Sequence, residues 1–125
     1  MDKVIEKIFQ EFKNECKKKK NVIVMKQAKK DANDFFNLSN AQHVLNFITN
    51  DGLENLYFLN KKRWENNPKP KNKIMIYAFE FTTGMKLGYI AFFMNLAGKW
   101  LIKSFHLSQR SSKALEEALV KALKK

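Results

Sequence analysis

The chain has 125 residues, of which 24 are Lys or Arg and 12 are Asp or Glu, so its formal net charge is +12. Hydrophobic residues make up 45% and aromatic residues 13%, which predicts a folded chain forming a single domain over residues 1–125. Such an excess of positive charge opposes compaction and is usually kept for an anionic partner. Nucleic acid, an acidic protein and an anionic membrane surface all qualify. A lysine- and asparagine-rich genome is the alternative explanation.

The sequence argues against a membrane span, export and sequence-specific DNA recognition. No apolar run approaches the ~20 residues of a spanning helix, and the N-terminus lacks a signal-peptide core. Arg63 and Arg110 are the only arginines, which disfavours reading of base edges. Cys16 has no partner for an intrachain disulfide and lies on the apolar face of a predicted helix. We therefore expect Cys16 to be buried and the protein to be cytoplasmic.

The N-terminal half is predicted to be mainly helical. Apolar residues at helical spacing predict an amphipathic helix over residues 3–16, and the apolar run Val22–Met25, rich in β-branched residues, predicts a short strand. A second helix is expected from Ala28. Ser39–Gln42 fits a capping box that starts a third helix, and Asp51-Gly52 is a suitable end for it.

The C-terminal half is predicted to form a sheet and a last helix. Leu53–Leu59 favours a strand, and Asn60–Lys73 is typical of an exposed loop because it holds two prolines and six basic residues. Three strands joined by short turns should follow as an antiparallel meander: Ile74–Thr82, Met85–Asn95 and Trp100–Leu107. Ser111 or Ser112 would cap the last helix. The expected fold is α+β, with N-terminal helices and a C-terminal helix packed on an antiparallel sheet of three to five strands.

The last predicted strand and its exit carry the residues that suggest a reaction. Cleavage of RNA by its own 2′-hydroxyl needs a base, an acid for the leaving oxygen, and cations for the charge that develops on the phosphate. We expect His106 to be the acid or base, Lys103 and Arg110 to be cations, and Glu80 and Tyr77 to be further proton-transfer candidates. The alternatives are a hydrogen-bonded surface histidine, a surface charge at Glu80 and a core aromatic at Tyr77.

Strict alternation along this strand sorts its residues onto two faces. One face would hold Trp100, Ile102, Ser104 and His106, and the other Leu101, Lys103, Phe105 and Leu107.

The predicted basic loop is a candidate nucleic-acid surface. Six cations can meet a phosphate backbone: Lys61, Lys62, Arg63, Lys69, Lys71 and Lys73. Trp64 and Tyr57 can stack on unpaired bases. The alternative is a solvated charged loop with Trp64 packed onto the domain. No metal-ligand spacing links His43, His106 and Cys16, and no phosphate-cradling glycine motif occurs, so we expect no cofactor.

The order of elements after Lys73 carries a family resemblance. Antiparallel strands lead to a last strand Trp100–His106, a polar basic turn Leu107–Ser112, and an alanine-rich charged helix. In this order the segment resembles the RelE and HigB group of bacterial toxin ribonucleases. The resemblance implies a compact α+β fold, mRNA cleavage and inhibition by a cognate antitoxin. It also implies catalytic roles at the last strand and its exit, for Lys103, His106 and Arg110.

The leading hypothesis is therefore an RNA-binding, metal-independent endoribonuclease of toxin–antitoxin type. Two alternatives stay open. One is a non-catalytic module that binds single-stranded nucleic acid through charge and stacking. The other is an interaction protein whose positive surface meets an acidic partner such as an antitoxin or inhibitor.

Overall fold

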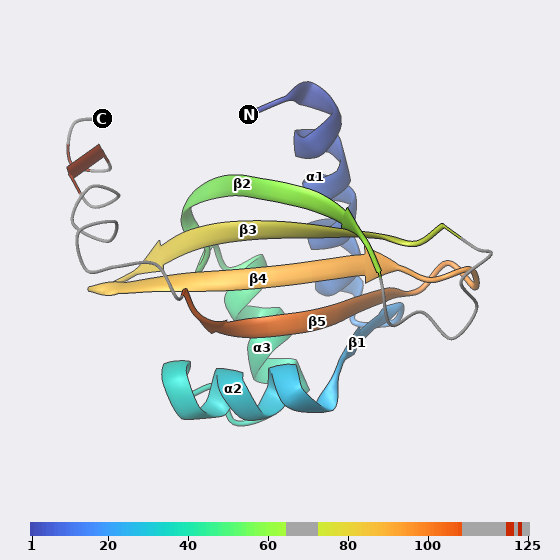
Figure 1. The fold of residues 1–125 in the computed structure, drawn as a ribbon. Coiled ribbons are helices and arrows are strands. Elements are labelled where there is room, and N and C mark those ends of the chain that lie inside the picture. The colour runs from blue at the N-terminus through green and yellow to red at the C-terminus, as the bar shows by residue number, and fades with distance from the viewer. Residues whose placement is uncertain (65–72, 109–119, 122, 124–125) are drawn as a thin grey trace.

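The computed structural model describes residues 1–64, 73–108, 120, 121 and 123 (Figure 1). Its elements, in chain order, are α1 (Lys3–Lys18), β1 (Val22–Val24), α2 (Lys26–Phe36), α3 (Ala41–Thr49), β2 (Glu54–Arg63), β3 (Met75–Thr83), β4 (Lys86–Met94) and β5 (Trp100–Leu107). The α+β class is confirmed. Most of the predicted C-terminal helix lies outside the described residues. In the part of the chain that the structure describes, every helix is too short or too polar to span a membrane.

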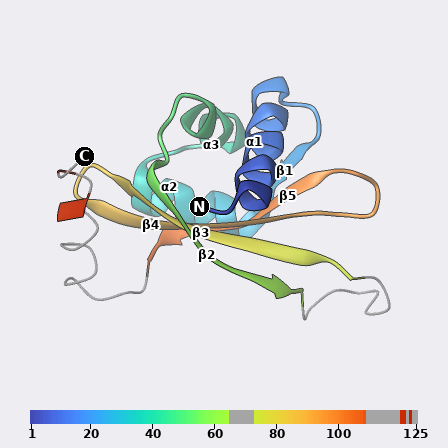
Figure 2. The same cartoon turned by 90° about the horizontal axis from the view of Figure 1, so that it is seen from above.

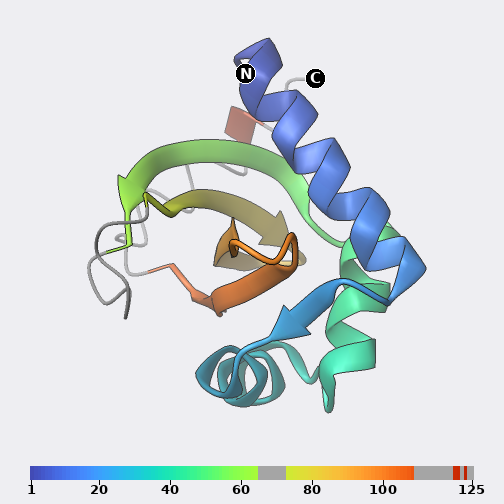
Figure 3. The same cartoon turned by 90° about the vertical axis from the view of Figure 1, so that its right-hand side faces the viewer.

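The five strands form one mixed sheet in the order β1-β5-β4-β3-β2. Strands β2 to β5 make the predicted antiparallel meander, whereas β1 pairs with β5 in parallel, with Val22 opposite Trp100. The prediction of a purely antiparallel sheet is therefore wrong at this edge. Two parallel strands need a long connection between them. The local pattern of the three-residue strand β1 therefore could not predict that it pairs with β5, which lies more than 70 residues later in the chain. Viewed along the strands, the sheet is curved, with β2 and β3 arching over β5 (Figure 3).

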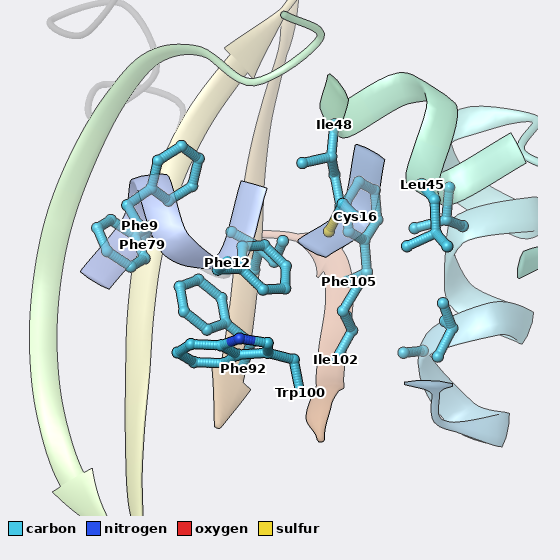
Figure 4. Packing of buried hydrophobic residues seen from close by; sticks show 14 of the residues in the cluster. Phe9, Phe12, Cys16, Leu45, Ile48, Phe79, Phe92, Trp100, Ile102 and Phe105 are labelled. Atoms are coloured by element: carbon cyan, nitrogen blue, oxygen red, sulfur yellow. The ribbon is translucent and has the colours of Figure 1, made fainter. Parts of the chain in front are cut away.

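All three helices pack on the same face of the sheet (Figure 2). Phe12 of α1 stacks on Phe92 of β4, with ring centroids 3.8 Å apart and planes at 4°. Phe36 of α2 and Phe47 of α3 both meet the ring of Phe105 edge-on. The main core is thus a set of interlocking aromatic rings between the helices and β3, β4 and β5 (Figure 4).

Two predicted boundaries are wrong. Strand β2 ends at Arg63 instead of Leu59, because Asn60 to Arg63 pair with β3 and are not part of a loop. An edge strand tolerates this lysine-rich stretch since one of its edges can stay in water. Helix α3 is capped by Asn40, whose side chain accepts the backbone N–H of His43 at 2.9 Å, and not by Ser39.

An irregularity in β5 changes which of its residues face the core. Phe92 pairs with Ile102 and Ala91 pairs with Ser104, so Lys103 is an extra residue in the ladder. Such a bulge reverses the side-chain alternation on one side of it. Ile102 and Phe105 consequently both lie in the core. The prediction that Ile102 shares a face with His106 is wrong for this reason.

Candidate functional site

The sheet face opposite α1, α2 and α3 holds a row of polar and aromatic side chains. Tyr57 of β2 pairs with Glu80 of β3, Glu80 pairs with Tyr89 of β4, and Tyr89 pairs with His106 of β5. Paired residues on neighbouring strands share a face and lie close enough for their side chains to touch. We call these four residues the cross-strand row. It places two of the predicted catalytic residues, Glu80 and His106, on one face of the sheet.

His106 is half-buried, and two contacts orient its ring. Nδ1 lies 2.7 Å from the carbonyl oxygen of Leu107, and the ring stacks on that of Tyr89, with centroids 4.9 Å apart and planes at 12°. A carbonyl oxygen only accepts hydrogen bonds, so Nδ1 carries the proton in this contact. In the neutral ring the lone pair therefore lies on Nε2, which is the atom that can take up a proton.

Glu80 is buried in the middle of β3, with 2% of its surface exposed. The hydroxyl of Ser108 donates a hydrogen bond to its Oε2 at 2.6 Å, which offsets part of the cost of burying a carboxyl group. The surface-charge alternative for Glu80 is therefore wrong. With 2% of its surface exposed, Glu80 is too buried to meet a phosphate directly, and one of its contacts is with the half-buried Ser108. Glu80 fits a positioning role better than direct contact with a substrate.

Tyr89 lies between these two residues and was not among the residues predicted from the sequence. Burial raises the pKa of Tyr89 above that of an exposed tyrosine. Its hydroxyl accordingly stays protonated at neutral pH and can donate a hydrogen bond. Alternation in β4 could have placed Tyr89 on the face opposite Ile90. Its position between Glu80 and His106 depends on the pairing of three strands, which no local pattern contains.

Tyr89 is expected to ionise at a higher pH than a free tyrosine amide, because burial raises its pKa by disfavouring the charged phenolate. An ultraviolet titration of the wild type, minus that of Tyr89→Phe, isolates this group. Free N-acetyltyrosinamide in the same buffer is the reference. A difference curve that coincides with the reference would contradict the burial of Tyr89.

The predicted cations lie at several places. Lys103 is half-buried at the bulge in β5. Lys61, Lys62 and Arg63 are exposed at the end of β2, and Lys73 is exposed just before β3. The pairing of β2 with β3 puts Lys62 opposite Ile76, on the face of the cross-strand row, and puts Lys61 and Arg63 on the other face. Arg110, Lys69 and Lys71 lie outside the described residues.

The remaining aromatic candidates differ in their exposure. Trp64 packs on the fully buried Phe93, with ring centroids 4.6 Å apart, so the alternative that Trp64 packs onto the domain is confirmed. Tyr77 stacks on Phe92 at the helix-covered face, as a core aromatic does. Tyr57, in contrast, is 59% exposed.

Cys16 and His43 stand apart from the cross-strand row. Cys16 is fully buried, as predicted, and burial raises the pKa of its thiol to about 12. A thiol with such a pKa stays protonated and is a poor nucleophile. His43 is exposed on α3. Among the described residues, no three His, Cys, Asp or Glu side chains gather closely enough to hold a metal ion.

Comparisons with known proteins found no family model, no curated protein and no solved structure that matches this chain. The resemblance to the RelE and HigB group therefore stays a prediction.

Proposed function

We propose that the protein binds RNA on the sheet face opposite the helices and cleaves it near the end of β5, as a metal-independent endoribonuclease of toxin type. The observation that carries the proposal is the cross-strand row, in which His106, Tyr89 and Glu80 occupy neighbouring strands of one face. A histidine with a fixed ring orientation, stacked on a neutral phenol that itself neighbours a buried carboxyl group, is suited to proton transfer.

In the proposed reaction, Nε2 of His106 takes the proton of the RNA 2′-hydroxyl. The 2′-oxygen forms a bond to phosphorus, and the bond from phosphorus to the 5′-oxygen breaks. The leaving 5′-oxygen takes a proton from solvent water, and protonated His106 gives its proton back to the solvent. The products are a 2′,3′-cyclic phosphate and a 5′-hydroxyl. Tyr89 holds the imidazole ring by stacking, and its hydroxyl is a hydrogen-bond donor near the phosphate. Glu80 acts through Ser108 and positions this end of β5.

Charge supports RNA as the substrate. The chain carries a net charge of +12, and Lys62 is exposed on the same face as the cross-strand row. Lys103 precedes His106 by three residues and is close enough along β5 to contribute to the field at the phosphate. The same positive surface would attract an acidic protein inhibitor, which is the role we propose for an antitoxin.

A second candidate function is the binding of single-stranded nucleic acid without cleavage. The burial of Glu80 favours it, since a carboxyl group with 2% of its surface exposed does not meet a substrate directly. This candidate keeps the same RNA-binding face and differs only in having no reaction at His106.

The test is incubation of purified protein with RNA in EDTA, beside RNA whose 2′-hydroxyls are methylated. The proposal expects both to bind, RNA alone to be cut, and the fragments to carry 2′,3′-cyclic phosphate and 5′-hydroxyl ends. Binding of both without cleavage of either would support the second candidate and contradict the first. Binding of neither at ~50 mM salt, where phosphate contacts are strong, would contradict both.

A further inference from the structure

We infer that Tyr57 is a stacking platform for an unpaired RNA base and forms, with Lys62, a nucleotide subsite on β2 beside the cross-strand row. The inference rests on the proposed function, because it says which part of the sheet face holds the RNA. Its ligand class is single-stranded nucleic acid, bound through one base and the neighbouring phosphate.

Tyr57 is the exception among the tyrosines and tryptophans of this chain, all of which the structure describes. The other four each have an aromatic partner: Tyr77 and Trp100 meet Phe92, Tyr89 meets His106, and Trp64 meets Phe93. Among the residues that the structure describes, Tyr57 has no ring partner, and it is 59% exposed, although Glu80, opposite it on β3, is only 2% exposed. An open aromatic ring on a strand is a feature that single-strand binding proteins use for base stacking.

An irregularity in β2 places a cation on the same face as this ring. Strict alternation would put Tyr57 and Lys62 on opposite faces, since they are five residues apart. The ladder shifts between Phe58 and Asn60, and Lys62 is thereby paired with Ile76. Ile76 and Glu80 are four residues apart on β3 and share a face, so their partners Lys62 and Tyr57 share it too. The two lie about 13 Å apart along the strand, a spacing at which one nucleotide strand can meet both.

The position of Tyr57 relative to His106 fits a substrate that crosses the sheet. Both belong to the cross-strand row, at its two ends, and three strand spacings of about 4.8 Å separate them. A base on Tyr57 would therefore hold the strand a short distance from the reacting phosphate. The positive charge of Lys62 and of the whole chain makes an RNA strand the favoured occupant over an uncharged partner.

The test measures binding with oligonucleotides that the protein cannot cut, so that it does not depend on cleavage. Wild type, Tyr57→Ala and Tyr57→Phe are titrated with a fluorescent 2′-O-methyl RNA and with an abasic version of it. Phe35→Ala is the matched control, because Phe35 is also a partly exposed aromatic residue but lies on α2. Circular dichroism checks that each variant is folded.

We expect Tyr57→Ala to weaken binding of the 2′-O-methyl RNA by about 10- to 100-fold and to leave the abasic version unaffected, while Tyr57→Phe and Phe35→Ala bind as the wild type does. Unchanged binding by Tyr57→Ala would overturn the subsite and leave the proposed function standing. An equal loss on the abasic strand would overturn base stacking. Failure of the wild type to bind any oligonucleotide would instead overturn the proposed function. A change of oligomeric state in Tyr57→Ala, without a change in binding, would assign the ring to a contact between copies of the chain and overturn the inference.

Discussion

Replacement of His106 by alanine is expected to slow RNA cleavage by about 100- to 10,000-fold, the range that a positioned acid or base contributes. The loss should appear in the rate of bond cleavage at saturating RNA, because His106 is proposed to move a proton in the reaction and not to hold the RNA. Single-turnover cleavage in EDTA, followed by gel electrophoresis of end-labelled RNA, measures it.

Two further variants serve as controls for the His106→Ala result. His106→Phe keeps an aromatic ring against Tyr89 but carries no proton, so it should be as inactive as His106→Ala. His43→Ala removes the other histidine of the chain, which is exposed on α3, and should cleave as the wild type does. If all four proteins cleave at one rate, the activity belongs to a contaminant and the enzyme proposal is wrong.

Replacement of Phe92 by alanine is expected to lower the free energy of unfolding by about 4 kcal/mol, as truncation of a fully buried phenylalanine does. Phe92 has no exposed surface and stacks on Phe12 of α1 and Phe79 of β3. It also meets Trp100 of β5 edge-on. The substitution would therefore leave a cavity between α1 and three strands at once. Urea unfolding followed by circular dichroism measures the change.

Phe35→Ala is the matched control for this stability experiment. Phe35 is 39% exposed, and substitutions at such positions usually change stability by no more than about 0.5 kcal/mol. A loss at Phe92 no greater than the loss at Phe35 would contradict the packing between α1 and the sheet. A different outcome is that the unfolding free energy of Phe92→Ala falls less steeply with urea concentration while the urea midpoint of unfolding is unchanged. That result would indicate a change in the unfolded state.

Local patterns in the sequence were sufficient for most elements. Helix α1 follows from apolar residues at helical spacing, four of which are buried in the structure: Ile5, Phe9, Phe12 and Cys16. The bounds of β5, Trp100–Leu107, agree with the prediction at both ends. These features depend on residues a few positions apart, and the periodicity of a helix or strand reports them directly.

The faces of β5 and the end of β2 could not be predicted in the same way. The extra residue Lys103 exists only relative to the ladder with β4, and the pairing of Asn60 to Arg63 exists only relative to β3. Both features depend on the register between two paired strands, and that register is determined by how the side chains of the two strands pack. The sequence of either strand alone reads as regular alternation in the first case and as a polar loop in the second.

For the candidate site, too, the sequence predicted some features and not others. The residue types of the candidate site were readable from the chain, because His106, Glu80 and the lysines are visible as residues, and the net charge of +12 is the basis on which an anionic partner is predicted. Their arrangement was not readable. Glu80 and His106 are 26 positions apart, and they share a face because β4 carries Tyr89 between them. Composition and short-range periodicity are local properties of the chain. The cross-strand row depends on the pairing of four strands that are distant in sequence, and this pairing is set only when the chain folds.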